Sequence, residues 1–194
     1  MKKIYFLLIA SILLGVSCNT ISAQAPYKAS VGGVLPSFFA VGPSAKFFFS
    51  DHLAFQADIM LKNGFTIGKD IDSNQRGLVL YVGLETNLNF VYQKKLKEKK
   101  KTELFWFTGS GISFGYTLAG NGKFGANAIV GMEYVFKNSP ISIQVDFRPG
   151  YGMLFSFDRS PVSGFFFTHK SPWSHFDWLI GFTLRYTFKK KIDN

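Results

Sequence analysis

The chain has 194 residues and a formal net charge of +10, and 18% of its residues are aromatic, 23 of them phenylalanine. Its one cysteine, Cys18, lies close to the N-terminus. Disulfide frameworks, thiolate zinc sites and cysteine nucleophiles are therefore excluded from the rest of the chain, whose length fits one domain.

The N-terminus has the pattern of a secretory signal peptide, which we assign to residues 1–23. Two lysines precede an apolar run over 4–16, and Ala23 is a small residue at a plausible cleavage point. The run is shorter than the roughly 20 apolar residues that a membrane-spanning helix needs. Lipoprotein processing at Cys18 is the alternative. Residues 24–194 are then the mature domain.

The mature domain shows apolar residues at every second position. In LAFQADIMLK (53–62), for example, Leu53, Phe55 and Ala57 alternate with smaller or polar residues. Segments of nine to twelve residues with this alternation are typical of a transmembrane β-barrel, whereas soluble sandwiches have shorter strands and less aromatic outer faces. The pattern predicts an all-β, eight-stranded antiparallel up-and-down barrel with strands near 27–35, 43–50, 53–63, 78–92, 104–117, 125–137, 141–155 and 177–188.

The polar positions of these strands predict a charged lumen. In ISIQVDFRPG (141–150), Ile143, Val145 and Phe147 alternate with Gln144, Asp146 and Arg148. An eight-stranded barrel is just wide enough for side chains to fill it, and buried charges must be paired or hydrated. We expect a network of four acids and four bases that acts as a structural plug, with an ion pathway as the alternative: Lys46, Asp58, Lys62, Glu85, Glu133, Asp146, Arg148 and Arg185.

An even strand count puts both termini on one side, which we expect to be the periplasm. Short turns are predicted at 50–52 and 138–140 on that side. Longer, glycine-rich connections at 64–77, 118–124 and 156–176 are expected on the extracellular side. The strand LFWFTGSGISFGY has an ambiguous phase, and a bulge near Gly109 or Gly111 would reconcile its two halves.

Much of the positive charge is local. The segment QKKLKEKKK (93–101) holds six lysines and Glu98. A block of like charges is usually exposed, so we expect a solvated turn, with anionic lipid headgroups or an acidic periplasmic partner as the alternative contact. Nucleic acid is not expected as a partner, because the lysines belong to the periplasmic side of the predicted barrel.

The run GMEYVFKNSPISIQVDFRPGYG, together with a last strand ending in LRYTF, resembles the small outer-membrane β-barrel proteins of Bacteroidetes-type bacteria, which are OmpA/OmpX-like eight-stranded barrels. The likeness covers the last third of the chain most strongly and implies a fold rather than an activity. The last strand also resembles the signal that the outer-membrane barrel assembly machinery reads, with Phe188 in the terminal aromatic position and Lys189 to Asn194 following it.

One segment offers candidate catalytic residues. THKSPWSHFD (168–177) places His169 two residues before Ser171, with Asp177 as a possible orienting acid. An H-x-S arrangement in a small barrel resembles the outer-membrane lipid A deacylases, in which a histidine activates a serine. Pro172 and Trp173 follow Ser171 where those enzymes have Asn-Gly. A two-histidine metal site is a further alternative, although catalytic zinc sites normally have three protein ligands.

We therefore expect a monomeric, non-enzymatic barrel of the Gram-negative outer membrane, without a cofactor or a metal. Its partners are expected to be outer-membrane lipids, lipopolysaccharide and the assembly machinery. Its extracellular connections would present binding surfaces, or the barrel would contribute to envelope integrity. A lipid A-modifying hydrolase and a narrow, porin-like channel are the alternatives.

Overall fold

The alternating segments form nine β-strands in the part of the chain that the structure describes. The computed structural model describes residues 26–36, 40–70, 76–118, 121–158, 166–167 and 173–188. Valine, isoleucine and aromatic residues recur in these segments because they pack well on a pleated surface. The strands are β1 (Ala29–Pro36), β2 (Ala40–Phe48), β3 (Leu53–Asp70), β4 (Arg76–Glu98), β5 (Thr102–Thr117), β6 (Asn121–Phe136), β7 (Ile141–Asp158), β8 (Phe166–Phe167) and β9 (Trp173–Phe188).

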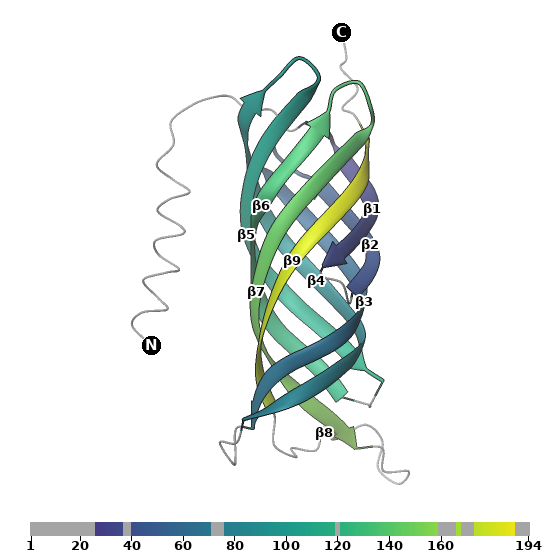
Figure 1. Ribbon diagram of the computed structural model, residues 1–194, viewed down its shortest axis with the longest axis vertical. Helices are drawn as coiled ribbons and strands as arrows, with labels where there is room; N and C mark the ends of the chain where they lie inside the picture. The colour runs from purple at the N-terminus through teal and green to yellow at the C-terminus, as the bar shows by residue number, and fades with distance from the viewer. Residues whose placement is uncertain are drawn as a thin grey trace, which may run out of the picture.

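Eight of these strands close into an antiparallel barrel (Figure 1). Each strand from β1 to β7 pairs with the next one along the chain, and β9 completes the ring by pairing with both β7 and β1. The short β8 pairs with the end of β7. The predicted eight-stranded, all-β antiparallel barrel is therefore confirmed. Among the described residues, no helix has the length and apolar character needed to cross a bilayer.

The predicted connections 64–77, 118–124 and 156–176 are wrong in extent. The ladder between β3 and β4 continues from Leu53 opposite Tyr92 to Lys69 opposite Arg76, so most of the first connection is strand. β6 begins at Asn121, and β9 begins at Trp173. Glycine does not end these strands, because both backbones of a paired ladder satisfy their hydrogen bonds without any side chain.

The predicted bulge near Gly109 or Gly111 is also wrong. β5 keeps one register against β6 along its length, and against β4 it shifts only between Lys95 and Lys97. The phase of β5 looked ambiguous because Phe105 and Phe107 point into the barrel, whereas Ser110 points outward. β5 therefore carries apolar residues on both its lumen face and its outer face without any change of register.

The lysine-rich segment is only partly a turn. β4 continues to Glu98 and β5 begins at Thr102, so the turn proper is Lys99–Lys101. The expectation of a solvated turn over all of 93–101 is therefore wrong. Lysine is compatible with a strand here because the antiparallel ladder supplies the backbone bonds, while the long side chains remain outside the lumen or pair with acids.

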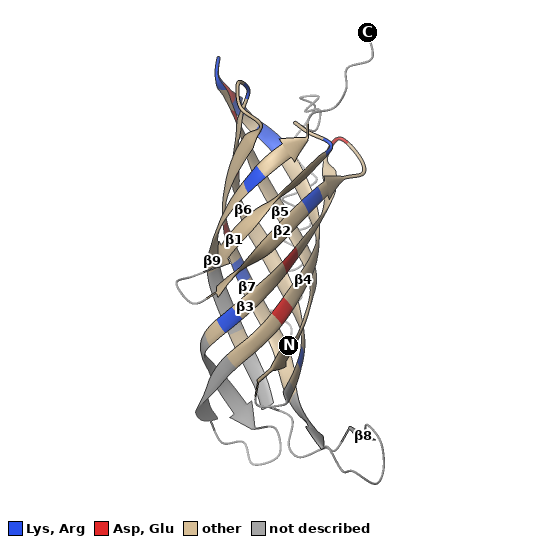
Figure 2. Ribbon diagram, turned by 90° about the vertical axis from the view of Figure 1, so that its right-hand side faces the viewer, with Lys and Arg blue, Asp and Glu red and all other residues tan. Residues whose placement is uncertain are grey.

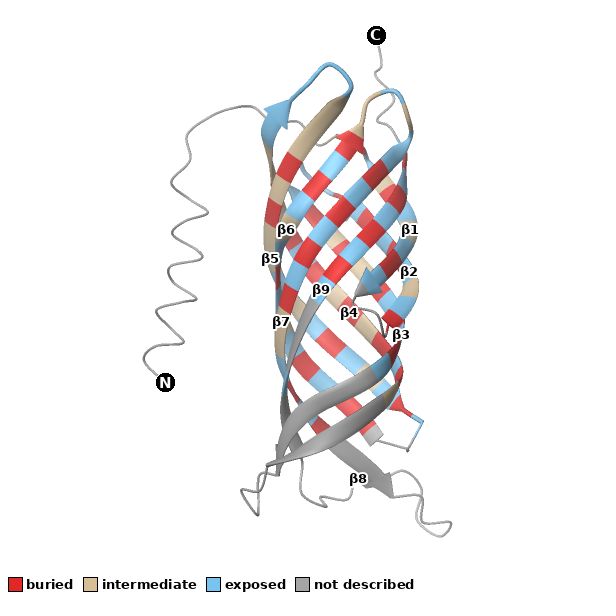
Figure 3. Cartoon of the chain, in the orientation of Figure 1, coloured by how far each residue is buried: buried red, intermediate tan, exposed pale blue. Residues whose placement is uncertain are grey.

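Buried and exposed residues alternate along the strands of the barrel (Figure 3). The buried set is rich in polar and charged residues: Gln56, Asp58, Asn89, Glu133 and Gln144 are all fully buried. The exposed set is rich in large apolar residues, such as Leu84, Phe90 and Leu184. The outside of the barrel is thus apolar, and most of the buried positions inside it are polar or charged.

Two glycines make room for large lumen side chains. A Cβ atom added at Gly131 would lie 2.6 Å from the Cζ atom of Phe107, and one added at Gly181 would lie 2.7 Å from Oδ1 of Asp146. Both distances are far below van der Waals contact, so any larger residue would displace the neighbour. Glycine at these two positions therefore leaves space for the lumen side chains of Phe107 and Asp146.

Candidate functional site

The eight charged residues predicted for the lumen are all buried inside the barrel. They lie on six strands of the barrel, β2, β3, β4, β6, β7 and β9. Relative exposure is at most 9% for each of Lys46, Asp58, Lys62, Glu85, Glu133, Asp146, Arg148 and Arg185. Their side chains form three groups along the barrel axis.

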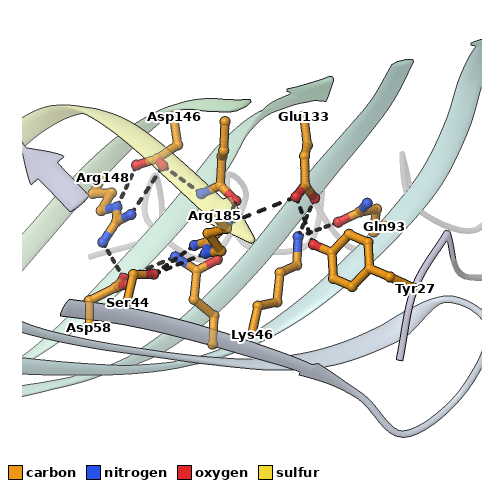
Figure 4. A network of polar contacts seen from close by, with 11 residues as sticks. Tyr27, Ser44, Lys46, Asp58, Gln93, Glu133, Asp146, Arg148 and Arg185 are labelled. Atoms are coloured by element: carbon orange, nitrogen blue, oxygen red, sulfur yellow. Dashed lines mark hydrogen bonds and ion pairs between the residues drawn. The ribbon is translucent and has the colours of Figure 1, made fainter. Parts of the chain in front are cut away.

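The first group surrounds Glu133 (Figure 4). The hydroxyl of Tyr27 donates a hydrogen bond to Oε1 of Glu133 at 2.6 Å, and Nζ of Lys46 pairs with Oε2 at 2.9 Å. Nη1 of Arg185 lies 4.0 Å from the same carboxylate. Lys46 also donates to the amide oxygen of Gln93. This carboxylate is thus held by two cations and a phenol.

The second group joins two acids through one arginine. Nη1 of Arg148 lies 2.6 Å from Oδ2 of Asp58, and its Nη2 lies 3.0 Å from Oδ2 of Asp146. The amide of Gln144 also donates to Asp146, at 2.6 Å. Arg185 links the first two groups, because its guanidinium donates to Gln144 and to Ser44 (Figure 4).

The third group contains a lysine that the sequence prediction missed. Glu85 lies 2.6 Å from Nζ of Lys123 and 3.4 Å from Nζ of Lys62. Lys123 is 3% exposed and belongs to β6. The sequence pattern had assigned Lys123 to the connection 118–124. However, Lys123 is two residues before Gly125 and four before Asn127, so it points to the same side of β6 as they do. Among the described residues the lumen therefore holds five bases and four acids, and the predicted balance of charge is wrong by one.

An apolar cluster fills the lumen at the end that carries the short turns. Its members come from strand segments next to those turns, and Lys46 lies over one of its rings with Nζ 4.9 Å from the centroid of Phe107. Sequence reasoning missed this cluster because apolar residues were assigned to the outer face. The cluster consists of Tyr27, Phe48, Ala54, Val91, Phe105, Phe107, Ile129 and Val135.

The outer wall carries an apolar band with aromatic residues towards its edges. On the side of the short turns, the ring of Tyr92 lies 5.9 Å from that of Trp106 and 5.7 Å from the imidazole of His52. Tyr116 lies ten residues after Trp106 on the outward face of β5. Ten residues of a strand tilted by about 40° span about 25 Å along a barrel axis.

The candidate catalytic residues are mostly outside the described part of the chain. Ser171 and His169 lie outside it, and the backbone of Asp177 pairs with Gly150 in the β7–β9 ladder. Within the described ranges, no three His, Cys, Asp or Glu side chains are grouped so that they could hold a metal ion. The deacylase-like arrangement therefore stays a prediction.

The lumen groups and the apolar band are the two features from which a function can be inferred. Searches of protein-family models, curated proteins and solved structures found no match to this chain.

Proposed function

We propose that this protein is a non-enzymatic β-barrel of the bacterial outer membrane, anchored by its apolar band and presenting its extracellular connections for binding or for envelope integrity. The observation that supports this most is the inverted distribution of residues. Phe90 is 64% exposed on the outer wall, whereas Asp58 and Glu133 are fully buried in the lumen. Lipid is the environment in which that distribution is favourable.

A soluble barrel would require the opposite arrangement. Soluble eight-stranded barrels enclose apolar side chains or a small ligand and expose polar ones. Contiguous exposed apolar patches beyond a few hundred Å² are rare on soluble monomers. Here the exposed apolar residues extend over all eight barrel strands, for example Val31, Phe47, Ile59, Leu84, Ile112, Val130, Val145 and Leu184.

The height of the band also supports a bilayer. The span of about 25 Å between Trp106 and Tyr116 equals the height of the apolar band on outer-membrane barrels, which aromatic girdles flank at both interfaces. A closed ring of eight strands satisfies the backbone hydrogen bonds of its paired segments, as lipid requires. Both ends of the described barrel, Pro26 and Phe188, lie on the side of the short turns, which we propose faces the periplasm (Figure 1).

The proposal extends to five further features that the sequence predicts. They include the signal peptide over 1–23, membership of the small outer-membrane barrel family, recognition of the last strand by the assembly machinery, a monomeric state and contact with lipopolysaccharide. Each one is consistent with an eight-stranded barrel whose last strand ends at Phe188.

The lumen favours an anchor over a channel. Along the axis, the apolar cluster fills the short-turn end, and the groups around Glu133 and Arg148 follow it with their side chains paired across the lumen. An ion would have to displace these pairs and then enter an apolar region, and each uncompensated buried charge costs several kcal/mol.

We expect the refolded protein to insert into phospholipid vesicles as a barrel that stays folded in cold detergent and unfolds on boiling. The measurement is a heat-dependent shift in gel mobility, with protection of the barrel from protease. Planar bilayers containing the inserted protein should show no stepwise conductance. A protein that stayed soluble and monomeric without detergent would contradict the proposal, and steady single-channel steps would favour the channel.

The non-enzymatic part is tested by the lipid A of cells that express the protein. We expect its mass to be unchanged with the original chain, with Ser171→Ala and with His169→Ala. Loss of a nucleophile or its base removes orders of magnitude of rate, so a true hydrolase would be easy to recognise. A lipid A species short of one acyl chain, made by the original chain and by neither variant, would establish an enzyme.

A further inference from the structure

A groove lies on the outer wall of the barrel, where β4, β5 and β6 run side by side. Its volume is about 410 Å³, and it lies beside Tyr116, at the edge of the apolar band farther from the short turns. Figure 2 shows basic and acidic segments together at the short-turn end of the barrel, away from the groove. The outward-facing residues that line the groove are Leu84, Thr86, Phe114, Tyr116, Gly122 and Phe124.

The register of the three strands produces this groove. Tyr116 of β5 lies opposite Gly122 of β6, which has no side chain to fill the wall at that position. One outward row away, Phe114 lies opposite Phe124, and both rings are exposed on the wall. Gly122 itself is buried, so it forms the floor of the groove. The groove is therefore a hollow beside two aromatic rings, and its depth depends on Gly122.

The lining of the groove combines apolar groups with hydroxyls and presents no charge. Lys123 borders the groove, but its ammonium group points into the lumen and lies 2.6 Å from Glu85. The polar side chains on the outward face are those of Thr86 and Tyr116. Thr86 lies opposite Phe114, which is two residues from Tyr116 towards the centre of the band. The Thr86 hydroxyl therefore lies on the hydrocarbon side of the aromatic edge, where interfacial rings mark the headgroup level.

The Thr86 hydroxyl indicates what kind of chain the groove holds. Among the described residues this hydroxyl has no hydrogen-bond partner, and an unpaired hydroxyl is unfavourable in a nonpolar environment. A hydroxyl can both donate and accept a hydrogen bond. The acyl chains of ordinary phospholipids offer no such group, whereas the primary acyl chains of lipid A carry a hydroxyl at their third carbon. That hydroxyl lies just below the ester, at the depth of Thr86.

We propose that this groove binds a hydroxylated acyl chain of lipid A, with the hydroxyl of the chain bonded to Thr86 and its methylene groups over Gly122. The inference rests on the proposed function, because it requires that the apolar band lies in an outer membrane whose extracellular leaflet contains lipopolysaccharide. Dispersion contacts with the rings of Phe114 and Phe124 stabilise the chain. A second copy of the barrel would present a convex wall, which does not enter a hollow of this shape.

Two outward-facing residues outside the groove provide matched controls. Thr108 lies on the same face of β5, opposite Tyr92, in the half of the band nearer the short turns. T86V and T108V each replace one outward-facing hydroxyl by a methyl group, but only T86V does so in the groove. Gly33 is exposed on β1, where an added Cβ would lie 3.9 Å from the nearest atom, the carbonyl oxygen of Gly42. G33L therefore adds the same side chain as G122L without filling the groove.

The experiment measures the lipid that stays bound after the barrel is extracted from nanodiscs. The nanodiscs contain equal amounts of synthetic lipid A and of an analogue in which hydrogen replaces its free acyl hydroxyls, and native mass spectrometry gives the ratio of the two bound lipids. We expect the original chain to prefer the hydroxylated lipid roughly two- to ten-fold, the effect of one net hydrogen bond. T86V should remove the preference, whereas T86S and T108V should retain it. G122L should lower the total bound lipid roughly three- to ten-fold through lost dispersion contacts, and G33L should leave it unchanged.

The outcomes separate the inference from the function on which it rests. Insertion with a heat-shifted mobility but no preference for the hydroxylated lipid would overturn the inference alone, as would an equal effect of T86V and T108V. A dimer that forms without lipid A and is lost in G122L would also overturn it, because a second copy would then fill the groove. Failure of the original chain to enter the lipid would overturn the proposed function as well. A preference that T86V removes and T108V retains supports the site.

Discussion

Replacing Phe147 by Arg is expected to destabilise the inserted barrel by about 2–4 kcal/mol, the cost of an arginine on the lipid face near the bilayer midplane. Phe147 points outward from β7, with Val130 and Ile180 as its neighbours on the two flanking strands. No described acid lies at these positions. The measurement is urea unfolding of the protein in vesicles, followed by gel mobility.

The control places the same charge outside the apolar band. Leu96 is 53% exposed at the bulge of the β4–β5 hairpin, so Leu96→Arg should alter stability by no more than about 0.5 kcal/mol, as for an ordinary surface substitution. Equal effects of the two arginines would contradict a bilayer around the band. A harmless Phe147→Arg would mean that this face of β7 contacts water.

The two faces of β7 could be predicted from sequence for a simple physical reason. Side chains on a strand alternate strictly, so once Ile143 and Val145 are assigned to the outside, Gln144 and Asp146 must point inside. The alternation of side chains assigns the two faces of a strand without any knowledge of its neighbours. It placed every charged residue that it assigned to the lumen on the buried side.

Residues whose burial depends on the length of a strand or on its partners could not be found from alternation alone. Lys123 was missed because glycines around it looked like a connection, yet β6 pairs with β7 from Asn121 onward. Phe105 and Phe107 are apolar, so alternation alone gave no sign that they fill the lumen. The bulge at Leu96 depends on the register between β4 and β5, which the sequence of one strand does not contain.

The ion pairs were the least predictable part of the lumen. Arg148 and Asp58 are 90 residues apart in sequence, and they meet only because the closed ring sets β3 and β7 across one lumen. Four acids and four bases allow many pairings. The stagger between strands selects among them, and stagger is a property of the whole barrel rather than of any one strand.

Arg148 should be a highly sensitive charge in this lumen, because it bridges two buried acids, Asp58 and Asp146. Arg148→Met is expected to cost about 3–5 kcal/mol, since it leaves Asp58 and Asp146 close together without their common partner. Urea unfolding in vesicles measures the loss.

A triple variant distinguishes the loss of the charge pair from the loss of packing. Arg148→Met combined with Asp58→Asn and Asp146→Asn removes the charges, and each asparagine keeps an oxygen that can accept the hydrogen bond from Gln56 or Gln144. We expect this variant to recover most of the stability, because replacing a whole buried ion cluster is often nearly neutral. If the triple variant were as unstable as Arg148→Met alone, the guanidinium would be acting mainly by filling space, and the charges of this group would contribute little to the stability of the barrel.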